Sequence, residues 1–405
     1  FREAHCPHNL RYLEACEQNG ILYWAQMGAH LYFDKEEFRE NFRVLTKEWL
    51  RERRNSPSVI LWGIQNESML PESFAAEITG LIRSIDPTAS KQRLVVTCNG
   101  GTGSDWNIPQ NWSGTYGGSV EDYGNEIVRQ RLAGEYGQYR VVGKHEEGDV
   151  KQKQNTGGDV SEELFCYCLQ TKLREMEKKK DLAAGHFQWI FSSHANPGRE
   201  TIYCLDAAGG NRIGVVNNKG LLTCYGELSD AYYMYCSHYV PKTRPMIYIV
   251  SHTWPDRFAK GPAARSVTVY SNCDEVALYN DAGSLLLGRK RKGNFGEPFI
   301  FDNVMVNYGL LFARGYVDGV PCVEDMIWYE NLPMPENAEK LMDGQECMDA
   351  NGLDGDYLHR VNCGGEDYLD QYGRFWKKDQ PWDGRGFGFS SWDMEYPGLA
   401  GDFGS

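Results

Sequence analysis

Two glutamates lie at the ends of apolar segments that have the pattern of buried strands. Glu67 ends the segment SVILWGIQNE, and Glu135 lies in RLAGEYG at residues 131–137. In a parallel α/β barrel, side chains at the carboxyl ends of the strands point into the active-site mouth. Two carboxylates on this rim, about 5–5.5 Å apart, suit a retaining glycosidase, in which one protonates the leaving oxygen and the other attacks the anomeric carbon. The pair therefore predicts glycoside hydrolysis by double displacement.

Polar and aromatic residues near these segments could complete such a site. Asn66 precedes the first glutamate, and its amide could hydrogen-bond the sugar hydroxyl next to the reacting carbon. Trp189 and His194 follow the last predicted strand, where an indole could form the floor under a sugar ring; a Trp that only fills the barrel is the alternative. Arg2 and His5, in FREAHCP, could keep the nucleophile ionised. A strand-end glutamate by itself is more often structural, so the prediction depends on the whole set.

Residues 1–240 alternate short apolar runs with amphipathic segments. This alternation is typical of parallel βα units. Six such strands favour a TIM (β/α)8 barrel over a small open sheet. We predict strands at 21–27, 58–67, 93–100, 112–118, 131–137 and 186–191, and helices at 35–53, 72–85 and 161–179.

The pattern changes at about Pro241, where short alternating runs separated by turn residues begin. These runs predict an all-β sandwich over residues 241–333. Residues 334–352 have the proline and charge content of a linker, and residues 353–405 begin another β-rich unit with many Gly and aromatic residues. The chain is therefore expected to combine an α/β domain with β-rich domains.

The composition argues against several classes of protein. The 405 residues include 42 Lys and Arg against 56 Asp and Glu, a net charge of −14, and have no basic run, which argues against nucleic acid as a partner. No apolar run approaches the roughly 18 residues of a membrane span. The 12 Cys include no CxxC pair, so we expect no zinc site, and we predict neither a metal nor a cofactor. The chain begins at Phe1 without a signal peptide, which leaves the compartment open.

Several segments, in order, resemble the catalytic domain of glycoside hydrolase family 2, which includes β-galactosidases, β-glucuronidases and β-mannosidases. FREAHCP is similar to its Arg-x-x-His-x-Pro segment. RRNSPSVILWGIQNES resembles its Arg-(Asp/Asn)-x-x-Pro-Ser-(Val/Ile)-x-x-Trp-x-x-x-Asn-Glu signature, the most specific match. LAGEYGQYR resembles the Ser-Glu-(Phe/Tyr)-Gly strand that carries the nucleophile, with Gly134 in place of the usual Ser. HFQWIFSSH and GVVNNKGLLTCYGELSDAYYMYCSHY resemble the last strand and the closing helix.

By this resemblance Glu67 is the acid/base, Glu135 the nucleophile and Asn66 the partner of the sugar's 2-hydroxyl. Residues 241–333 resemble the family's immunoglobulin-like module, and the segment from His359 resembles the opening of a malectin-like carbohydrate-binding domain. The resemblance thus implies a partial TIM barrel, an immunoglobulin-like sandwich and an incomplete malectin-like module. The family's domains before the barrel, its first barrel strand and most of its second have no counterpart here, so we expect an internal fragment of a longer polypeptide.

The resemblance implies a retaining exo-β-glycosidase, with β-galactosidase as the first expectation. β-Glucuronidase and β-mannosidase are the alternatives. We identify no Asn-x-Lys element after Glu135 of the type that β-glucuronidases use for the uronate, which disfavours that sugar. A non-catalytic carbohydrate-binding protein is the alternative from another class, and the presence of both glutamates argues against it. The expected partner is an oligosaccharide or a polysaccharide-derived substrate; the oligomeric state is left open, and a periplasmic or extracellular location is expected by analogy alone.

Overall fold

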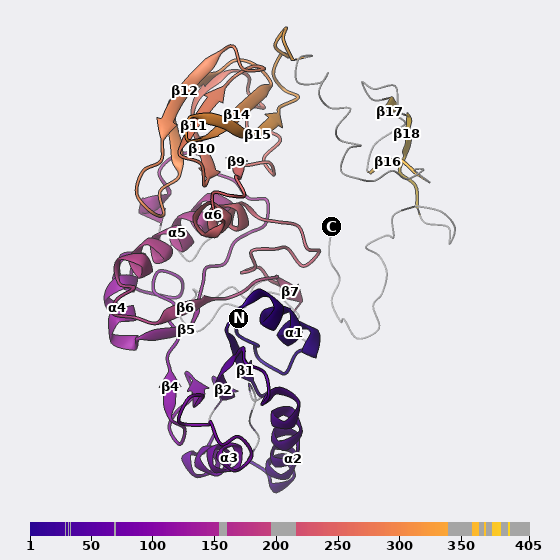
Figure 1. Cartoon of the computed structure of the whole chain (residues 1–405). Coiled ribbons are helices and arrows are strands. Elements are labelled where there is room, and N and C mark those ends of the chain that lie inside the picture. Colours follow the sequence, from indigo (N-terminus) through magenta and orange to yellow (C-terminus); the bar gives the residue numbers. More distant parts are fainter. Residues whose placement is uncertain are drawn as a thin grey trace. The chain divides into compact units, whose positions relative to one another are not determined.

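The computed structural model describes residues 1–28, 30, 32, 34–68, 70–153, 160–195, 216–338, 359–363, 368–369, 375–381 and 388. Contacts divide the chain into two compact units, which are described separately (Figure 1). The first unit comprises Phe1–Ser193, Asn218–His238 and Asn294–Glu297. The second comprises His194–Asn217, Tyr239–Gly293 and Pro298–Ser405.

Parallel strands form the centre of the first unit. Four of them pair side by side in the order β1, β2, β3 and β4, and β5 pairs with β6. Two backbone hydrogen bonds of 2.8 Å join the groups, from Gly134 N–H to Pro109 O and from Asn111 N–H to Glu135 O. The strands are β1 (Tyr23–Gln26), β2 (Val59–Asn66), β3 (Leu94–Cys98), β4 (Trp106–Ile108), β5 (Leu132–Tyr136) and β6 (Gly185–Gln188). This order of parallel strands with intervening helices is that of a TIM barrel.

Helices follow most of these strands and cover their outer side. Trp62 and Ile64 of β2 pack in one core with apolar residues of α2 and α3, and Figure 1 shows these two helices side by side. Leu61 points the other way, into a second cluster with Trp24 and Cys98, because successive side chains of a strand alternate. The helices are α1 (Leu10–Asn19), α2 (Glu36–Arg53), α3 (Glu72–Ile85), α4 (Tyr123–Gln130), α5 (Glu162–Lys178) and α6 (Asp230–Tyr239), with short 3-10 turns at Val120–Asp122 and Val150–Lys153.

One strand prediction is wrong. Residues 112–118 form turns, and the fourth strand is the shorter Trp106–Ile108. Two local features turn the chain there: the Asn111 carboxamide oxygen accepts hydrogen bonds from Ser113 N and Oγ, and Gly114 has a φ of 74°. Asn side chains and left-handed glycines are typical of turns. The helix α4 was also absent from the predicted set.

The second unit contains two antiparallel sheets that share one core. One sheet has the order β13-β10-β9 and the other β12-β11-β14-β15. Buried residues of both sheets, such as Val267 and Leu311, belong to a single apolar cluster. The short alternating runs of residues 241–333 form the strands β9 (Ile247–Val250), β10 (Ala263–Ser271), β11 (Glu275–Tyr279), β12 (Leu286–Arg291), β13 (Phe299–Val306), β14 (Leu310–Val317) and β15 (Val320–Trp328). Its immunoglobulin-like character stays a prediction.

The described residues of the second unit also include several short strands. The strand β7 (His194–Ala195) pairs antiparallel with β8 (Val216–Asn217). Near the end of the chain, β16 (Val361–Asn362), β18 (Phe375–Lys378) and β17 (Tyr368–Leu369) form a small sheet. Most residues of the expected linker and malectin-like module lie outside the described residues, so these assignments also stay predictions. Within the part of the chain that the structure describes, no helix is long and apolar enough to cross a membrane.

Candidate active site

Glu135 lies in β5 and is 4% exposed. Its Oε1 is 2.7 Å from Arg2 Nη1 and 3.6 Å from His5 Nε2. Burial raises the pKa of Glu135 to about 7; Arg2 opposes that rise, the charge of Glu67 adds to it, and Lys219 also opposes it. The structure therefore places two cations, Arg2 and Lys219, and the Glu67 carboxylate within electrostatic range of the buried Glu135 carboxyl group.

Arg2 connects the ends of several strands. Its Nη2 donates to Asn66 Oδ1 at 2.6 Å, its Nη1 donates to Gly134 O at 2.8 Å, and its Nε donates to Gln26 Oε1 at 2.9 Å. The guanidinium also lies over the indole of Trp24, 4.5 Å from the ring centre. Because the guanidinium is planar and rigid, these contacts fix the orientation of Asn66 relative to the buried carboxylate.

Glu67 follows β2 directly and is exposed, whereas its neighbour Asn66 is fully buried. Its φ is 50°, in the left-handed region that costs a residue with a Cβ on the order of 1 kcal/mol or more. Its N–H donates to Cys98 O at 2.9 Å, so the backbone stays joined to β3 while the side chain leaves the strand. The structure thus places this carboxylate at the strand end, in contact with solvent.

A stack of aromatic rings lies next to the buried carboxylate. The imidazole of His5 stacks on Trp189 at 4.5 Å between ring centres and on His30 at 4.9 Å. His30 Nδ1 is also 3.3 Å from Asn66 Nδ2. Trp189 continues from β6, where its N–H donates to Tyr136 O at 2.7 Å. The structure thus brings His5, Trp189 and Asn66 together, and adds His30, which the sequence analysis missed.

Lys219 is a further residue that the sequence analysis missed. It is 2% exposed, and its Nζ lies 5.7 Å from the ring centre of Trp112 and 5.6 Å from that of Tyr116. Residues 217–219 read Asn-Asn-Lys, so the expectation that no Asn-x-Lys element follows Glu135 is wrong. The signal was present in the sequence, but it stands far from the glutamates along the chain and lacks the apolar pattern by which the other candidates were found.

His194 is also a predicted sugar-binding residue. It lies in β7, in the second unit, where its Nδ1 is 2.9 Å from Ala195 O. Its role in sugar binding therefore stays a prediction, carried only by the sequence.

Gly134 stands where the family pattern has Ser, and the packing explains the exchange. A Cβ at this position would lie 2.6 Å from Cys98 Sγ and 3.4 Å from the indole of Trp24. Cys98 belongs to the cluster on the inner side of the strands. The larger side chain on β3 thus occupies the space that a side chain on β5 would need.

The described residues include no group of three or more His, Cys, Asp or Glu that could hold a metal ion. The groups that the structure places together at the site are carboxylates, cations and aromatic rings. A buried carboxylate beside an exposed one is an arrangement in which one group can attack and the other can exchange protons with water.

Comparison with known proteins confirms the predicted resemblance. Residues 1–115 match the family model described as "Glycosyl hydrolases family 2, TIM barrel domain". The chain is 29% identical over 352 residues to a protein of Formosa agariphila named "Putative beta-glucuronidase", which covers 78% of this chain and 40% of that protein. It is 25% identical over 362 residues to a "Beta-glucuronidase" of Bacteroides fragilis, covering 82% of this chain and 48% of that protein.

The fold is also similar to that of a solved β-glucuronidase structure. The apo structure of Bacteroides uniformis beta-glucuronidase 3 superposes with a TM-score of 0.67 at 25% identity, covering 81% of this chain and 44% of that one. A shorter match, 30% identical over 93 residues, is to a "Beta-galactosidase" of Thermoanaerobacterium thermosulfurigenes and covers 22% of this chain and 12% of that protein. The chain thus spans less than half the length of these relatives.

Proposed function

We propose that this chain carries the catalytic part of a retaining exo-β-glycosidase and that its sugar is a β-glucuronide. The family match and the names of the relatives support a glycosidase. The choice of sugar rests on the ammonium of Lys219, which is buried and lies within electrostatic range of Glu135. A glucuronide bears a carboxylate on its ring, and a desolvated cation near the reacting carbon would bind that group by a charge-assisted hydrogen bond.

Each glutamate would act twice in the double displacement. Glu135 attacks the anomeric carbon as the bond to the leaving oxygen breaks, and Glu67 gives its proton to that oxygen. In the second step Glu67 takes a proton from water, the hydroxyl adds to the anomeric carbon, and the Glu135 carboxylate is released. Arg2 supports this mechanism because its ion pair favours the ionised form of Glu135.

The proposed subsites divide the remaining residues by chemistry. Asn66, held by Arg2, offers its amide to the 2-hydroxyl of the sugar. Trp189 offers an apolar face to the sugar ring, and Lys219, over the rings of Trp112 and Tyr116, offers the positive charge. The β-galactosidase expectation is a second candidate, favoured by the shorter match to a β-galactosidase. A galactoside has no ring carboxylate, so it offers no anionic group that the buried Lys219 ammonium could bind.

Aryl glycosides that share one leaving group test this choice. In the full-length polypeptide we expect kcat/KM for the β-glucuronide to exceed that for the β-galactoside. Lys219→Met should lower kcat/KM for the glucuronide about 10- to 100-fold, since a hydrogen bond to a charged group contributes about 1.5–3 kcal/mol. The same variant should change the galactoside rate only a few-fold. A preference for the galactoside in the unmodified protein would overturn the assignment of the sugar.

A further inference from the structure

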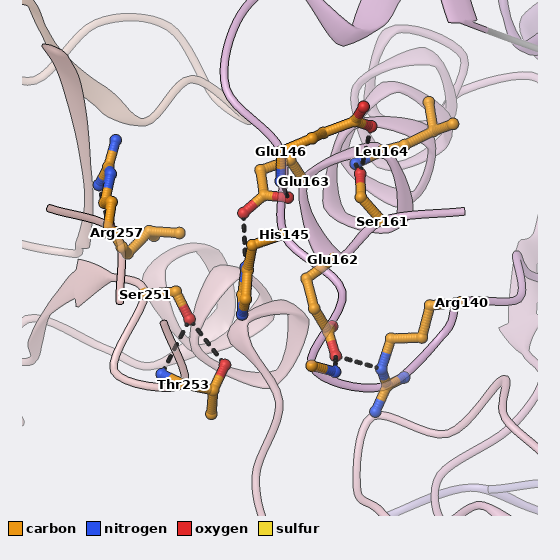
Figure 2. A network of polar contacts seen from close by, with 12 residues as sticks. Arg140, His145, Glu146, Ser161, Glu162, Glu163, Leu164, Ser251, Thr253 and Arg257 are labelled. Carbon is orange, nitrogen blue, oxygen red and sulfur yellow. Dashed lines mark hydrogen bonds and ion pairs between the residues drawn. The ribbon is translucent and has the colours of Figure 1, made fainter. Parts of the chain in front are cut away.

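A buried ion pair contacts the backbone of residues 218–220, the segment that carries Lys219. Arg140 follows β5, Glu162 begins α5, and they are 3% and 4% exposed. Arg140 Nε donates to Glu162 Oε1 at 2.9 Å (Figure 2). The proposed double displacement uses neither residue. A buried ion pair by itself contributes little to stability, because desolvation offsets the attraction, so its position needs another reason.

Arg140 contacts the backbone on both sides of Lys219. Its Nη1 donates to Gly220 O at 2.5 Å, and its backbone N–H donates to Asn218 O at 3.2 Å. Its guanidinium also lies over the ring of Phe165 in α5, 4.7 Å from the ring centre, which limits its freedom to move. Arg140 therefore sets the position of residues 218–220 from the side of β5 and α5.

The end of β6 holds the same segment from the other side. Lys219 O accepts from Gln188 Nε2 and from Ile190 N–H, both at 3.2 Å, and Gly220 N–H donates to Ser193 Oγ at 3.1 Å. The approach is close, because a Cβ on Gly220 would lie 2.1 Å from Ser193 N. A shift of this backbone would therefore break several hydrogen bonds at once. It would also move the Lys219 side chain.

The charge of Glu162 makes Arg140 suitable for this role. An unpaired guanidinium behind Lys219 would add a second positive charge, whereas the pair with Glu162 is neutral as a unit. Glu162 Oε1 also accepts from Gly143 N–H at 3.3 Å, which joins the loop after β5 to the start of α5. Beside it, His145 pairs with Glu163 at 2.7 Å and so balances the second acidic residue of the helix start (Figure 2).

We propose that Arg140, paired with Glu162, is a positioning residue that determines the preference for anionic sugars by holding the backbone of residues 218–220. It keeps the Lys219 ammonium over Trp112 and Tyr116, where the carboxylate of a uronic acid glycoside binds. The inference rests on the proposed function. Arg140 itself touches no substrate, so its loss acts through the placement of Lys219.

The test compares an aryl β-glucuronide with an aryl β-glucoside of the same leaving group, in the full-length polypeptide. Arg140→Lys keeps a cation but cannot reproduce the fixed donors of the guanidinium. We expect KM for the glucuronide to rise roughly tenfold with kcat within about twofold, and the glucoside parameters to stay within about twofold. Glu162→Gln, which retains an acceptor for Arg140, should change KM in the same direction by a smaller factor.

Arg93→Lys is the matched control. Arg93 also donates to two backbone carbonyls, Arg54 O and Ser56 O, and pairs with Asp86 at 3.5 Å, but it stands before β3, at the opposite strand ends. The Arg93→Lys substitution should lower the thermal midpoint of unfolding without changing the ratio of kcat/KM between the two substrates. Equal losses on both substrates in Arg140→Lys, or no loss at all, would overturn the positioning role while the proposed function stands. An unmodified protein without any preference for the glucuronide would overturn both.

Discussion

The two glutamates of the site differ in almost every physical respect although both lie near the carboxyl end of a parallel strand. Glu135 is buried within β5, where Arg2 contacts it at 2.7 Å and burial raises its pKa to about 7. Glu67 is exposed, and its left-handed backbone turns it away from the strand that precedes it. Because a nucleophile needs one fixed position and an acid/base needs proton exchange with water, the contrast matches the two roles proposed for them.

The difference also shows which parts of the molecule maintain each residue. Glu135 depends on long-range contacts, since Arg2 comes from the start of the chain. Glu67 depends on local backbone geometry and on one hydrogen bond from its N–H to Cys98 O. Substitutions that affect the two sets separately therefore test whether the contrast is functional.

The largest expected effect comes from Glu135→Gln. This variant keeps the shape of the side chain but removes the attacking carboxylate, so turnover should fall roughly 10³-fold or more. The measurement is kcat on an aryl β-glucuronide in the full-length polypeptide. Glu126→Gln is the control, because this glutamate lies on α4 outside the site. Undiminished turnover in Glu135→Gln would show that another group attacks the sugar.

Glu67→Ala should have an effect that depends on the leaving group. A phenol of low pKa departs with little protonation, so the loss on such a substrate should be about tenfold or less in the first step. An aliphatic alcohol is a poor leaving group that needs the proton, and the loss there should reach about 10²- to 10⁴-fold. The measurement is kcat/KM across a series of leaving groups, and we expect kcat/KM to depend more steeply on the leaving-group pKa in the variant than in the unmodified protein. Equal losses across the series would contradict the acid role.

The pH dependence of kcat/KM should report the pKa of Glu135. The attacking form is the ionised one, so the rate should rise with pH up to about 7. Arg2→Met removes the cation that opposes the effect of burial, and the rising limb should move to higher pH by about one unit or more. Arg11→Met, an exposed arginine near the same end of the chain, is the control and should leave the limb in place. If the limb does not move in Arg2→Met, the ion pair with Arg2 does not control the ionisation of Glu135.

The sequence predicts the elements better than the contacts between them. The strands carrying the two glutamates and the helices α2, α3 and α5 could be predicted because continuous apolar runs and amphipathic periodicity are local properties. The false strand at 112–118 shows the limit, because alternating aromatic residues there belong to turns formed by Asn111 and Gly114.

The site shows the same limit. Arg2 and His5 could be proposed from a family motif, but their contacts with Glu135 join residues more than a hundred positions apart. Lys219 was missed because one lysine in a polar segment has no periodicity to mark it and its Asn-x-Lys spacing lies far from the glutamates along the chain, whereas its burial in the folded structure singles it out. The link from Arg140 through Gly220 to Lys219 depends entirely on tertiary contacts, so no sequence pattern contains it.

The smallest expected effect concerns stability. In the unfolded chain the carboxyl of Glu135 has an ordinary pKa near 4.3, and in the folded protein it is about 7. Between these values the folded state binds more protons than the unfolded state, so this residue lowers stability as pH rises from about 4.3 to 7. Glu135→Gln resembles the protonated form at every pH. It should therefore match the unmodified protein near pH 4 and exceed it at pH 8, on the order of 1–3 kcal/mol. Chemical denaturation at both pH values measures the difference, with the exposed Glu14→Gln as the control. A gap that stays constant with pH would mean that burial does not raise the pKa of Glu135, and the contrast between the two glutamates would then be one of position alone.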